Sequence, residues 1–346
     1  MANLPAVRLQ PSRPFTYTGV DYAGPFNVRA SKGRGHASYK GYVSIFVCMV
    51  TRAVHIEVVS DYSSKAFLAA FRRFVSRRGM CRIMYSDQGT TFKGAANDIE
   101  KLFAANSNFI KDVSANVKEE GVEWSFIPPK APHHGGLWES KVKSFKHHFR
   151  RVTGDLKLTF EELSTLATQI EACINSRLLS PLTGDANDIN ALTPGHFLIG
   201  GPIQILPAPY SPCEEPSRTP TERWLLIQKI LGDFWRRWRV EVLHDLQRRS
   251  KWLEPRRNLQ INDIVIIMDD LCPPATWSLG RVIQRHPGPD GLTRVVTLQT
   301  STTKLRRPVT KLILLPVNNE ATIHFTAVHC QGQVVSRRAE ESIINL

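Results

Sequence analysis

Hydrophobic and polar positions between residues 15 and 200 predict an α/β domain. The predicted strands, rich in β-branched and aromatic residues, are 15–28, 42–50, 54–59, 82–86 and 122–127. The predicted helices, where hydrophobic residues recur at helical spacing, are 63–78, 95–105, 136–152 and 159–178. Gly79 ends the first helix, and Thr159 with Glu162 forms a capping box before the last. The order β-β-β-α-β-α-β-α-α is typical of one α/β domain that ends near Gly200.

The second part of the chain begins with a proline-rich stretch. Six prolines within residues 201–221 predict a linker, and residues 222–252 then have the period of one long helix. Predicted short strands, which together suggest a small all-β barrel, are 259–268, 277–284, 295–300 and 309–315. Residues 1–14 predict an extended arm, and residues 317–346 form a tail. We expect residues 222–316 to fold as one unit without the core, with the tryptophans of the helix docked on the barrel, the core or another subunit.

Composition limits the class of partner. The 346 residues hold 45 Lys and Arg against 31 Asp and Glu, a net charge of +14, which favours a polyanion such as nucleic acid. No apolar stretch approaches the roughly 20 residues of a membrane span, and no signal peptide is evident. The six cysteines include no CxxC pair, so we expect reduced thiols and no zinc site. The expected protein is soluble and intracellular.

Three acids occupy positions from which they could converge. Asp21 lies in the middle of the first predicted strand, Asp87 ends the fourth, and Glu139 opens the helix that follows Gly135 and Gly136. If the first and fourth strands are neighbours, the three carboxylates face one another and repel unless divalent cations bridge them. Hard oxygen ligands favour Mg²⁺ or Mn²⁺ over zinc. Two such ions about 4 Å apart would support phosphoryl transfer.

Three motifs carry a family resemblance: Ser-Asp-Gln-Gly-Thr-Thr-Phe at 86–92, His-His-Gly-Gly-Leu-Trp-Glu at 133–139 and Leu-Thr-Pro-Gly-His-Phe-Leu-Ile-Gly at 192–200. Over roughly residues 10–200 the chain resembles Pao-type (BEL/Pao) LTR retrotransposon integrases, and the following helix and barrel are similar to their C-terminal domain. The resemblance implies a ribonuclease H-like core with a mixed five-stranded sheet, then an SH3-like barrel. It also implies a DDE-type polynucleotidyl transferase in which Asp21, Asp87 and Glu139 hold two Mg²⁺ or Mn²⁺ ions.

The resemblance further implies partners and a location. The implied partners are element-end DNA, target DNA and further copies of the chain, with no small-molecule cofactor. The protein would be present in the cytoplasm before import and would act in the nucleus. Asp87 and Glu139 are further apart in sequence than in retroviral enzymes, which leaves room for an insertion around residues 106–120. The zinc domain that usually precedes such a core is not expected here. A polyprotein fragment, a domesticated copy and a decaying copy all remain open.

Basic residues beside the third acid are candidate DNA contacts. Lys143 and Lys146 follow Glu139 by four and seven positions, so they share its helix face, either to hold a DNA end or as a solvated surface. Arg150 extends this stripe, and His134 is expected in a loop near DNA rather than on a metal. In the long helix, Arg236 and Arg237 are candidate phosphate contacts, whereas the apolar face beside them predicts interdomain packing more than base stacking.

The sequence therefore predicts a two-metal DNA-strand transferase that processes element ends and joins them to target DNA. One alternative is a ribonuclease H-type nuclease, which generally adds an acid from the first helix. Residues 63–78 contain neither Asp nor Glu, which disfavours that alternative. The other alternative is a catalytically silent, transposon-derived protein that binds DNA or directs assembly.

Overall fold

The computed structural model describes residues 8, 10–31, 37–113, 122–127, 132–183, 188–206, 220–247, 258–269 and 272–315. Their packing divides the chain into two compact units. The first comprises Met1–Arg177, Pro194–Glu241 and Pro273–Ala275, and the second comprises Leu178–Thr193, Val242–Cys272 and Thr276–Leu346. None of the described helices is long and apolar enough to cross a membrane.

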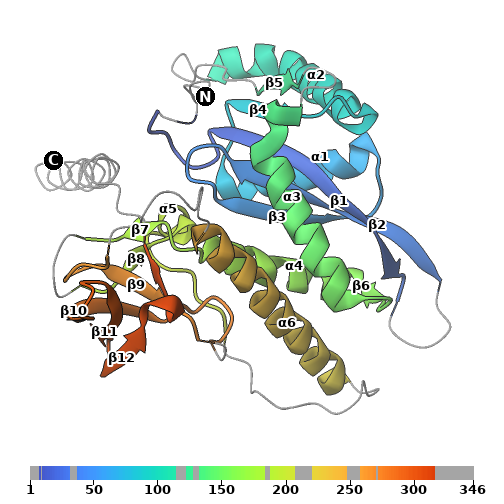
Figure 1. The fold of residues 1–346 in the computed structure, drawn as a ribbon. Coiled ribbons are helices and arrows are strands. Elements are labelled where there is room, and N and C mark those ends of the chain that lie inside the picture. Colours follow the sequence, from blue (N-terminus) through green and yellow to red (C-terminus); the bar gives the residue numbers. More distant parts are fainter. Residues whose placement is uncertain are drawn as a thin grey trace, which may run out of the picture. The chain divides into compact units, whose positions relative to one another are not determined.

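A mixed sheet forms the centre of the first unit (Figure 1). Its strands are β1 (Tyr17–Arg29), β2 (Ser38–Cys48), β3 (Val54–Val59), β4 (Ile83–Ser86) and β5 (Glu123–Phe126). The order is β3-β2-β1-β4-β5, with β1, β2 and β3 antiparallel and with β4 and β5 parallel to β1. A short strand, β6 (Leu158–Thr159), also pairs with the end of β1. The expected mixed sheet is confirmed, and its pairing of β1 with β4 is compatible with a ribonuclease H-like core.

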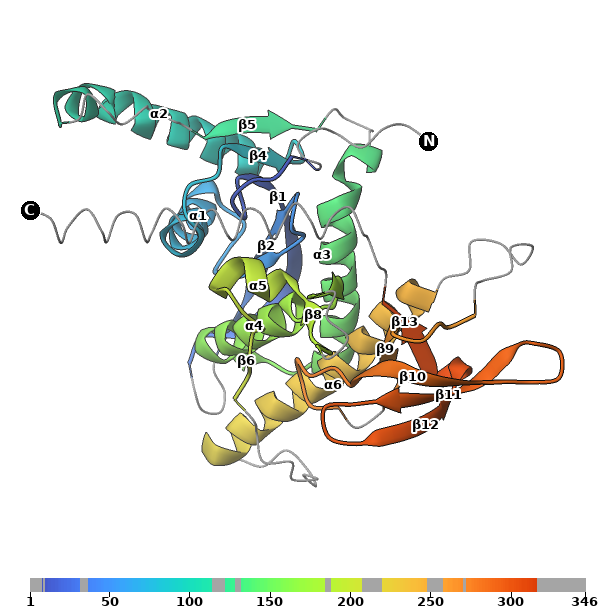
Figure 2. The ribbon, with the colours of Figure 1, turned by 90° about the vertical axis from the view of Figure 1, so that its left-hand side faces the viewer.

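Helices cover both faces of this sheet, as Figure 2 shows for α1 and α3. The helices of the first half are α1 (Ser64–Arg78), α2 (Thr90–Val113), α3 (Pro132–Thr153), α4 (Phe160–Asn175) and α5 (Pro194–Ile199). The Ser63 hydroxyl caps α1, which ends at Gly79 with φ of 81°. The predicted capping box of Thr159 and Glu162 is present at α4. Helix α2 is longer than predicted and includes residues 106–113, where an insertion was expected.

Alternation along β1 decides which side chains face which helices. Val20 belongs to the core cluster with Phe67 and Phe92, so this face of β1 is covered by α1 and α2. Gly19 points to the opposite face, where the ring of Trp138 in α3 lies against it. Because side chains alternate along a strand, Asp21 lies on the α3 face as well. The fold therefore brings the first acid to the helix that carries the third.

Side chains of helix α4 form hydrogen bonds with the backbone of β3, the strand at one edge of the sheet. The Asn175 side chain accepts a hydrogen bond from the Val54 amide at 2.8 Å and donates to the Val54 carbonyl at 2.7 Å. Glu171 accepts from the Ile56 amide at 2.7 Å. These two side chains satisfy backbone groups that an edge strand would otherwise leave unpaired, which protects the sheet from pairing with another strand.

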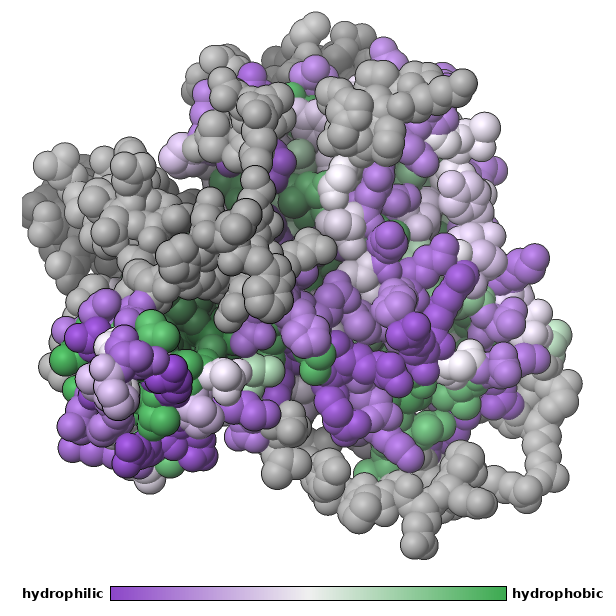
Figure 3. All heavy atoms as spheres, in the orientation of Figure 1, coloured by the Kyte–Doolittle hydropathy of each residue, from purple (hydrophilic) through white to green (hydrophobic). Residues whose placement is uncertain are grey.

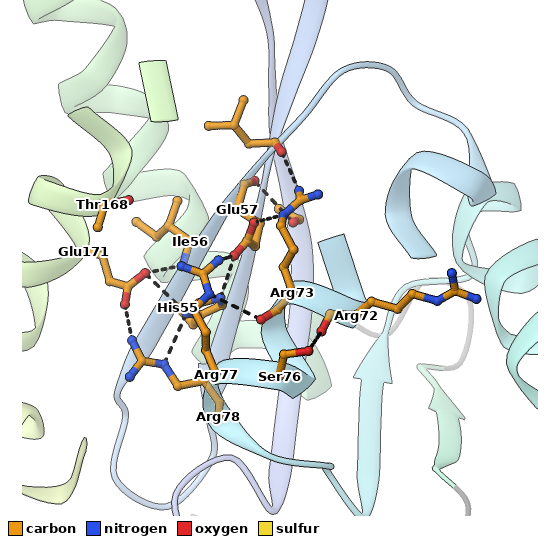
Figure 4. A network of polar contacts seen from close by, with 12 residues as sticks. His55, Ile56, Glu57, Arg72, Arg73, Ser76, Arg77, Arg78, Thr168 and Glu171 are labelled. Atoms are coloured by element: carbon orange, nitrogen blue, oxygen red, sulfur yellow. Dashed lines mark hydrogen bonds and ion pairs between the residues drawn. The ribbon is translucent and has the colours of Figure 1, made fainter. Parts of the chain in front are cut away.

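A buried ionic network joins β3, α1 and α4 (Figure 4). Glu57 Oε1 lies 3.0 Å from His55 Nε2, and Glu57 Oε2 lies 2.6 Å from the guanidinium of Arg73. Arg78 pairs with Glu171 at 2.5 Å. Burial alone would raise the pKa of Glu171, but the hydrogen bond from His55 and the charge of Arg78 lower it below its ordinary value. Because each acid has basic partners, we assign this network to the stability of the fold.

The tryptophans of helix α6 (Pro220–Gln247) were expected to dock on the barrel, on the core or on another subunit. Up to Glu241 the helix belongs to the first unit. There Phe234 is buried, with its ring 6.2 Å from that of Phe145 in α3, and Arg223 pairs with Glu162 of α4. The apolar face of α6 is thus used for packing on the core helices. Its buried residues in this unit include Ile227, Ile230, Leu231, Phe234, Trp235 and Trp238.

The second unit contains a five-stranded antiparallel sheet. Its strands are β9 (Ile264–Ile267), β10 (Leu279–Pro287), β11 (Thr293–Gln299), β12 (Lys304–Pro308) and β13 (Leu312–Leu314), in the order β12-β11-β10-β9-β13. A separate short ladder joins β7 (Ser180–Pro181) to β8 (Ala191–Leu192). Strand β12 was not predicted, because it is short, basic and largely exposed. The predicted strand at 309–315 instead begins with a 3₁₀ turn, Val309–Lys311.

The compact units do not coincide with the domains expected from the sequence. The expected C-terminal unit of residues 222–316 is divided between them, since α6 contributes its residues up to Glu241 to the first unit and its last turn to the second. In that last turn, Leu243 packs in a cluster with Ile264 and Ile266 of β9. The domain boundaries and the closure of the barrel stay predictions. The structure confirms a β-sheet in the second part and shows that its strands are antiparallel.

Candidate active site beside β1, β4 and α3

The three predicted acids come from two neighbouring strands and one helix. Asp21 lies in β1 opposite Ile45 of β2 and is half-buried. Asp87 directly follows β4, is exposed, and accepts a hydrogen bond from the Gly89 amide at 3.0 Å. Glu139 lies in α3 and is half-buried. Strands β1 and β4 are parallel neighbours, and their register, with Gly19 opposite Tyr85, brings Asp21 level with Asp87.

The pKa of Asp21 depends on the charges of the other two acids. Burial is the main cause that raises the pKa of Asp21 from 3.8 to about 6, and the charges of Asp87 and Glu139 raise it further. A hydrogen bond from the Tyr22 amide at 2.6 Å and the charge of Lys146 lower this pKa. The charges of Asp87, 66 positions later in the sequence, and of Glu139 thus act on Asp21, with Lys146 as a nearby cation.

The donor set fits a hard divalent cation in its chemistry. Among the described residues, no three Asp, Glu, His or Cys side chains converge closely enough to hold one ion as they stand. Burial, and to a lesser extent the charges of Asp87 and Glu139, disfavour the ionised form of Asp21, and a bound cation would favour that form. Asp87 is exposed, and the Gly89 amide holds its carboxylate in the turn that follows β4. Metal ligation by Asp21, Asp87 and Glu139 stays a prediction.

Gly19 allows the helix that carries Glu139 to pack closely on β1. A Cβ atom on Gly19 would lie 2.3 Å from Cε3 of Trp138, so only glycine leaves room for this ring against β1. Trp138 is 2% exposed and stacks on Tyr85 of β4, with ring centroids 6.2 Å apart. Since Trp138 directly precedes Glu139, this contact positions the third acid. From the sequence, Trp138 was only part of a motif.

Sequence reasoning missed Tyr62, in the connection between β3 and α1. Burial raises its pKa, and the charges of Asp87 and Asp21 raise it further, so this side chain belongs to the same site. The available signal was its position one residue before the N-cap Ser63, where a predicted strand and helix meet at the edge of the sheet. That position alone did not indicate which helix end or strand end it would face.

The predicted DNA contacts on α3 differ in their surroundings. Lys143 is exposed, whereas Lys146 is half-buried and acts on Asp21. Arg150 is exposed, with its guanidinium 3.5 Å from the carbonyl oxygen of Gly24. His134 was expected in a loop, but it lies in the first turn of α3, because Pro132 is compatible with a helix start. Its side chain lies outside the described part.

The two arginines predicted on α6 lie on its exposed side. Arg236 pairs with Asp233 of the same helix at 3.0 Å, and Arg237 is exposed near His148. Figure 3 shows that hydrophilic side chains predominate over α6 in this view. The structure brings neither arginine into the electrostatics of the three acids, so their role in binding phosphates stays a prediction.

We expect Asp21→Asn to stabilise the metal-free protein near neutral pH. The folded-state pKa of about 6 exceeds the ordinary 3.8, so ionising Asp21 costs folding free energy, and this cost grows as the pH rises between these values. The substitution should raise the free energy of unfolding on the order of 2 kcal/mol at about pH 8 and leave it unchanged at about pH 4. Chemical denaturation at both pH values measures this, and an equal effect at the two would contradict it.

Comparisons with known proteins cover the two parts of the chain unequally. Residues 222–315 match the model of a family of unknown function, DUF5641, a range that nearly coincides with the C-terminal segment predicted from the sequence. No curated protein matches the chain. A similar solved structure is a chain in the simian T-cell lymphotropic virus intasome in complex with PP2A regulatory subunit B56 gamma, at 11% identity and a TM-score of 0.34. The match covers 92% of this chain and 84% of that chain. A TM-score this low establishes neither the fold nor the activity.

Proposed function

We propose that this protein is an integrase-like DNA-strand transferase of the DDE type. One observation carries this function: Asp21, Asp87 and Glu139 share one electrostatic site beside neighbouring parallel strands, with the pKa of Asp21 raised. The three motifs at 86–92, 133–139 and 192–200, which resemble those of Pao-type integrases, supply two of the three acids. A ribonuclease H-like core followed by a small barrel belongs to the same proposal.

The residues of the chain would act mainly by orienting the carboxylates and by holding the metal ions. The amide of Tyr22 orients Asp21, and the amide of Gly89 orients Asp87. The packing of Trp138 against Gly19 positions Glu139. Bound Mg²⁺ or Mn²⁺ would neutralise these carboxylates, activate the attacking oxygen and stabilise the leaving oxygen. In processing, the attacking oxygen comes from water, and in joining it comes from a 3′-hydroxyl. In both, a new P–O bond forms as the existing P–O3′ bond breaks, and the displaced oxygen takes up a proton.

A strand-transfer assay tests this function directly. The full chain would be incubated with a short duplex and a supercoiled plasmid in Mn²⁺, with Ca²⁺ as the control ion, and joined products would be separated on a gel. Joined products in Mn²⁺ alone are expected. Cleavage of an RNA–DNA hybrid without joining would support the ribonuclease H-type nuclease instead. DNA binding with neither product, by a folded protein, would support the silent binding protein.

The partners follow from the same function. Element-end DNA and target DNA would bind largely through phosphates, so target choice should depend little on sequence. Joining two ends to one target calls for more than one active site, which favours a homo-oligomer acting in the nucleus. Exposed basic residues along α3 and α6 are available for phosphate contacts, and they include Lys143, Arg150, Arg236 and Arg237.

We expect the double substitution of Lys143 and Lys146 to alanine to flatten the salt dependence of DNA binding. For each lysine that neutralises a phosphate, its removal should reduce the slope of log affinity against log salt by about one unit. Fluorescence anisotropy over a salt series measures the slope. Lys40 of β2, which is exposed and lies on neither α3 nor α6, provides a Lys→Ala control. A slope unchanged by the double substitution would show that the two lysines form only a solvated surface.

A further inference from the structure

Tyr62 is an aromatic side chain held firmly beside the acids. Its ring centroid lies 5.0 Å from that of Tyr22 and 5.2 Å from that of Tyr42, yet the residue is 43% exposed. Its backbone carbonyl accepts a hydrogen bond at 2.9 Å from the hydroxyl of Thr91, in the first turn of α2. The connection that carries Tyr62 is therefore tied to the helix that follows Asp87.

The phenol oxygen of Tyr62 and the carboxylate of Asp87 flank the same turn. A Cβ atom built on Gly89 would lie 3.5 Å from the Tyr62 hydroxyl and 3.0 Å from Asp87 Oδ1. Burial and the charges of Asp87 and Asp21 raise the pKa of Tyr62, so its hydroxyl keeps its proton at neutral pH and remains a donor. A hydrogen-bond donor thus stands next to a group of acids that by themselves repel a phosphate.

We propose that the Tyr62 hydroxyl donates a hydrogen bond to a phosphate oxygen of the nucleic-acid strand bound at the acid site. The nature of this substrate rests on the proposed function. A Cβ atom on Gly89 would meet both the Tyr62 hydroxyl and Asp87 Oδ1, so the hydroxyl end of Tyr62 lies at the turn that carries Asp87. Lys146 approaches Asp21 from α3, whereas Tyr62 comes from the connection before α1. The nucleic-acid strand would then meet hydrogen-bond donors from two different elements of the protein.

The test compares Tyr62→Phe with Tyr42→Phe. Both remove one phenol oxygen from the same aromatic cluster, and Tyr62 is the one whose hydroxyl lies at the turn that carries Asp87. Binding of a short fluorescein-labelled DNA duplex would be measured in Ca²⁺, and strand-transfer kinetics in Mn²⁺. Removing a hydrogen bond to a charged group should weaken DNA binding and raise KM by about tenfold, with kcat nearly unchanged. Tyr42→Phe should match the wild type, and thermal melts would verify that both variants are folded.

Two outcomes would overturn the proposal. If Tyr62→Phe binds DNA like the wild type and only Tyr62→Ala weakens binding, the ring acts by stacking on a base. If kcat falls while KM and DNA affinity are unchanged, the hydroxyl acts on Asp87 rather than on substrate. The binding measurement needs no turnover, so it decides the role of Tyr62 even if the wild type joins no DNA. That absence of joining would instead contradict the proposed function.

Discussion

Replacing Asp87 with asparagine is expected to abolish Mn²⁺-dependent strand transfer while leaving DNA affinity unchanged or higher. The amide cannot neutralise a divalent cation, and a metal supplies several kcal/mol of transition-state stabilisation, so the rate should fall by about 10³-fold or more. DNA affinity should be unchanged or higher, because the substitution removes a negative charge that repels the phosphates of DNA. Joining kinetics and anisotropy on the same preparation measure the two effects. Asp87 is exposed, so the fold should be unaffected.

The matched control for this substitution is Asp155→Asn. Asp155 is exposed and lies beyond the last turn of α3, so it removes the same charge away from the three acids. It should leave the rate of joining unchanged. If Asp87→Asn retains most of the activity, the site does not use this acid, and the DDE mechanism is wrong. If Asp155→Asn is equally damaging, net charge rather than the site determines the rate.

Gly19→Ala is expected to destabilise the protein and to impair catalysis together. The added methyl group would lie 2.3 Å from Cε3 of the buried Trp138 ring, a contact that neither the strand nor an enclosed indole can accept. Overpacking of this kind costs about 1 to 3 kcal/mol of folding free energy. Relief requires α3 to move away from β1, which carries Glu139 away from Asp21. Urea denaturation and joining kinetics measure the two consequences.

Gly136→Ala is the matched control, because it makes the same change in α3 itself. Among the described residues, a Cβ atom on Gly136 meets nothing within 4 Å, and alanine is favoured over glycine in a helix by roughly 0.5 to 1 kcal/mol. This variant should therefore be as stable as the wild type or slightly more so, and as active. If Gly19→Ala also has wild-type stability and rate, Trp138 does not seat α3 on the strand.

Local sequence determined the elements whose signals are local. The run of β-branched residues at Val54–Val59 is β3, with the bounds that the pattern predicts. Ser63 and Gly79 delimit α1, and Thr159 with Glu162 caps α4, because capping depends on residues within one turn of the helix end. The order of these elements indicated an α/β domain, and the family resemblance implied its mixed sheet. Asp21 was identified in sequence because a strand rarely places an unpaired carboxylate in an apolar surrounding, and Asp87 and Glu139 were identified from their motifs.

Other features could be decided only by packing between distant segments. Strand β12 is basic and has no hydrophobic period of its own, so pairing with β11 creates it. The apolar face of α6 is evident in the sequence, but periodicity does not say which surface it covers, and most of it packs in the first unit. The ionic network around Glu57 and Glu171 likewise depends on partners from three elements.

The candidate site shows the same division. The sequence by itself determined that Asp21, Asp87 and Glu139 were the acids to consider, because their residue types and motifs can be read locally. Only the tertiary structure decided that burial and like charges raise the pKa of Asp21 and that Tyr62 stands beside Asp87. Tertiary structure also decided that Gly19 admits the Trp138 ring. The physical reason is that repulsion, burial and close packing are properties of pairs, and strand pairing brings these pairs together.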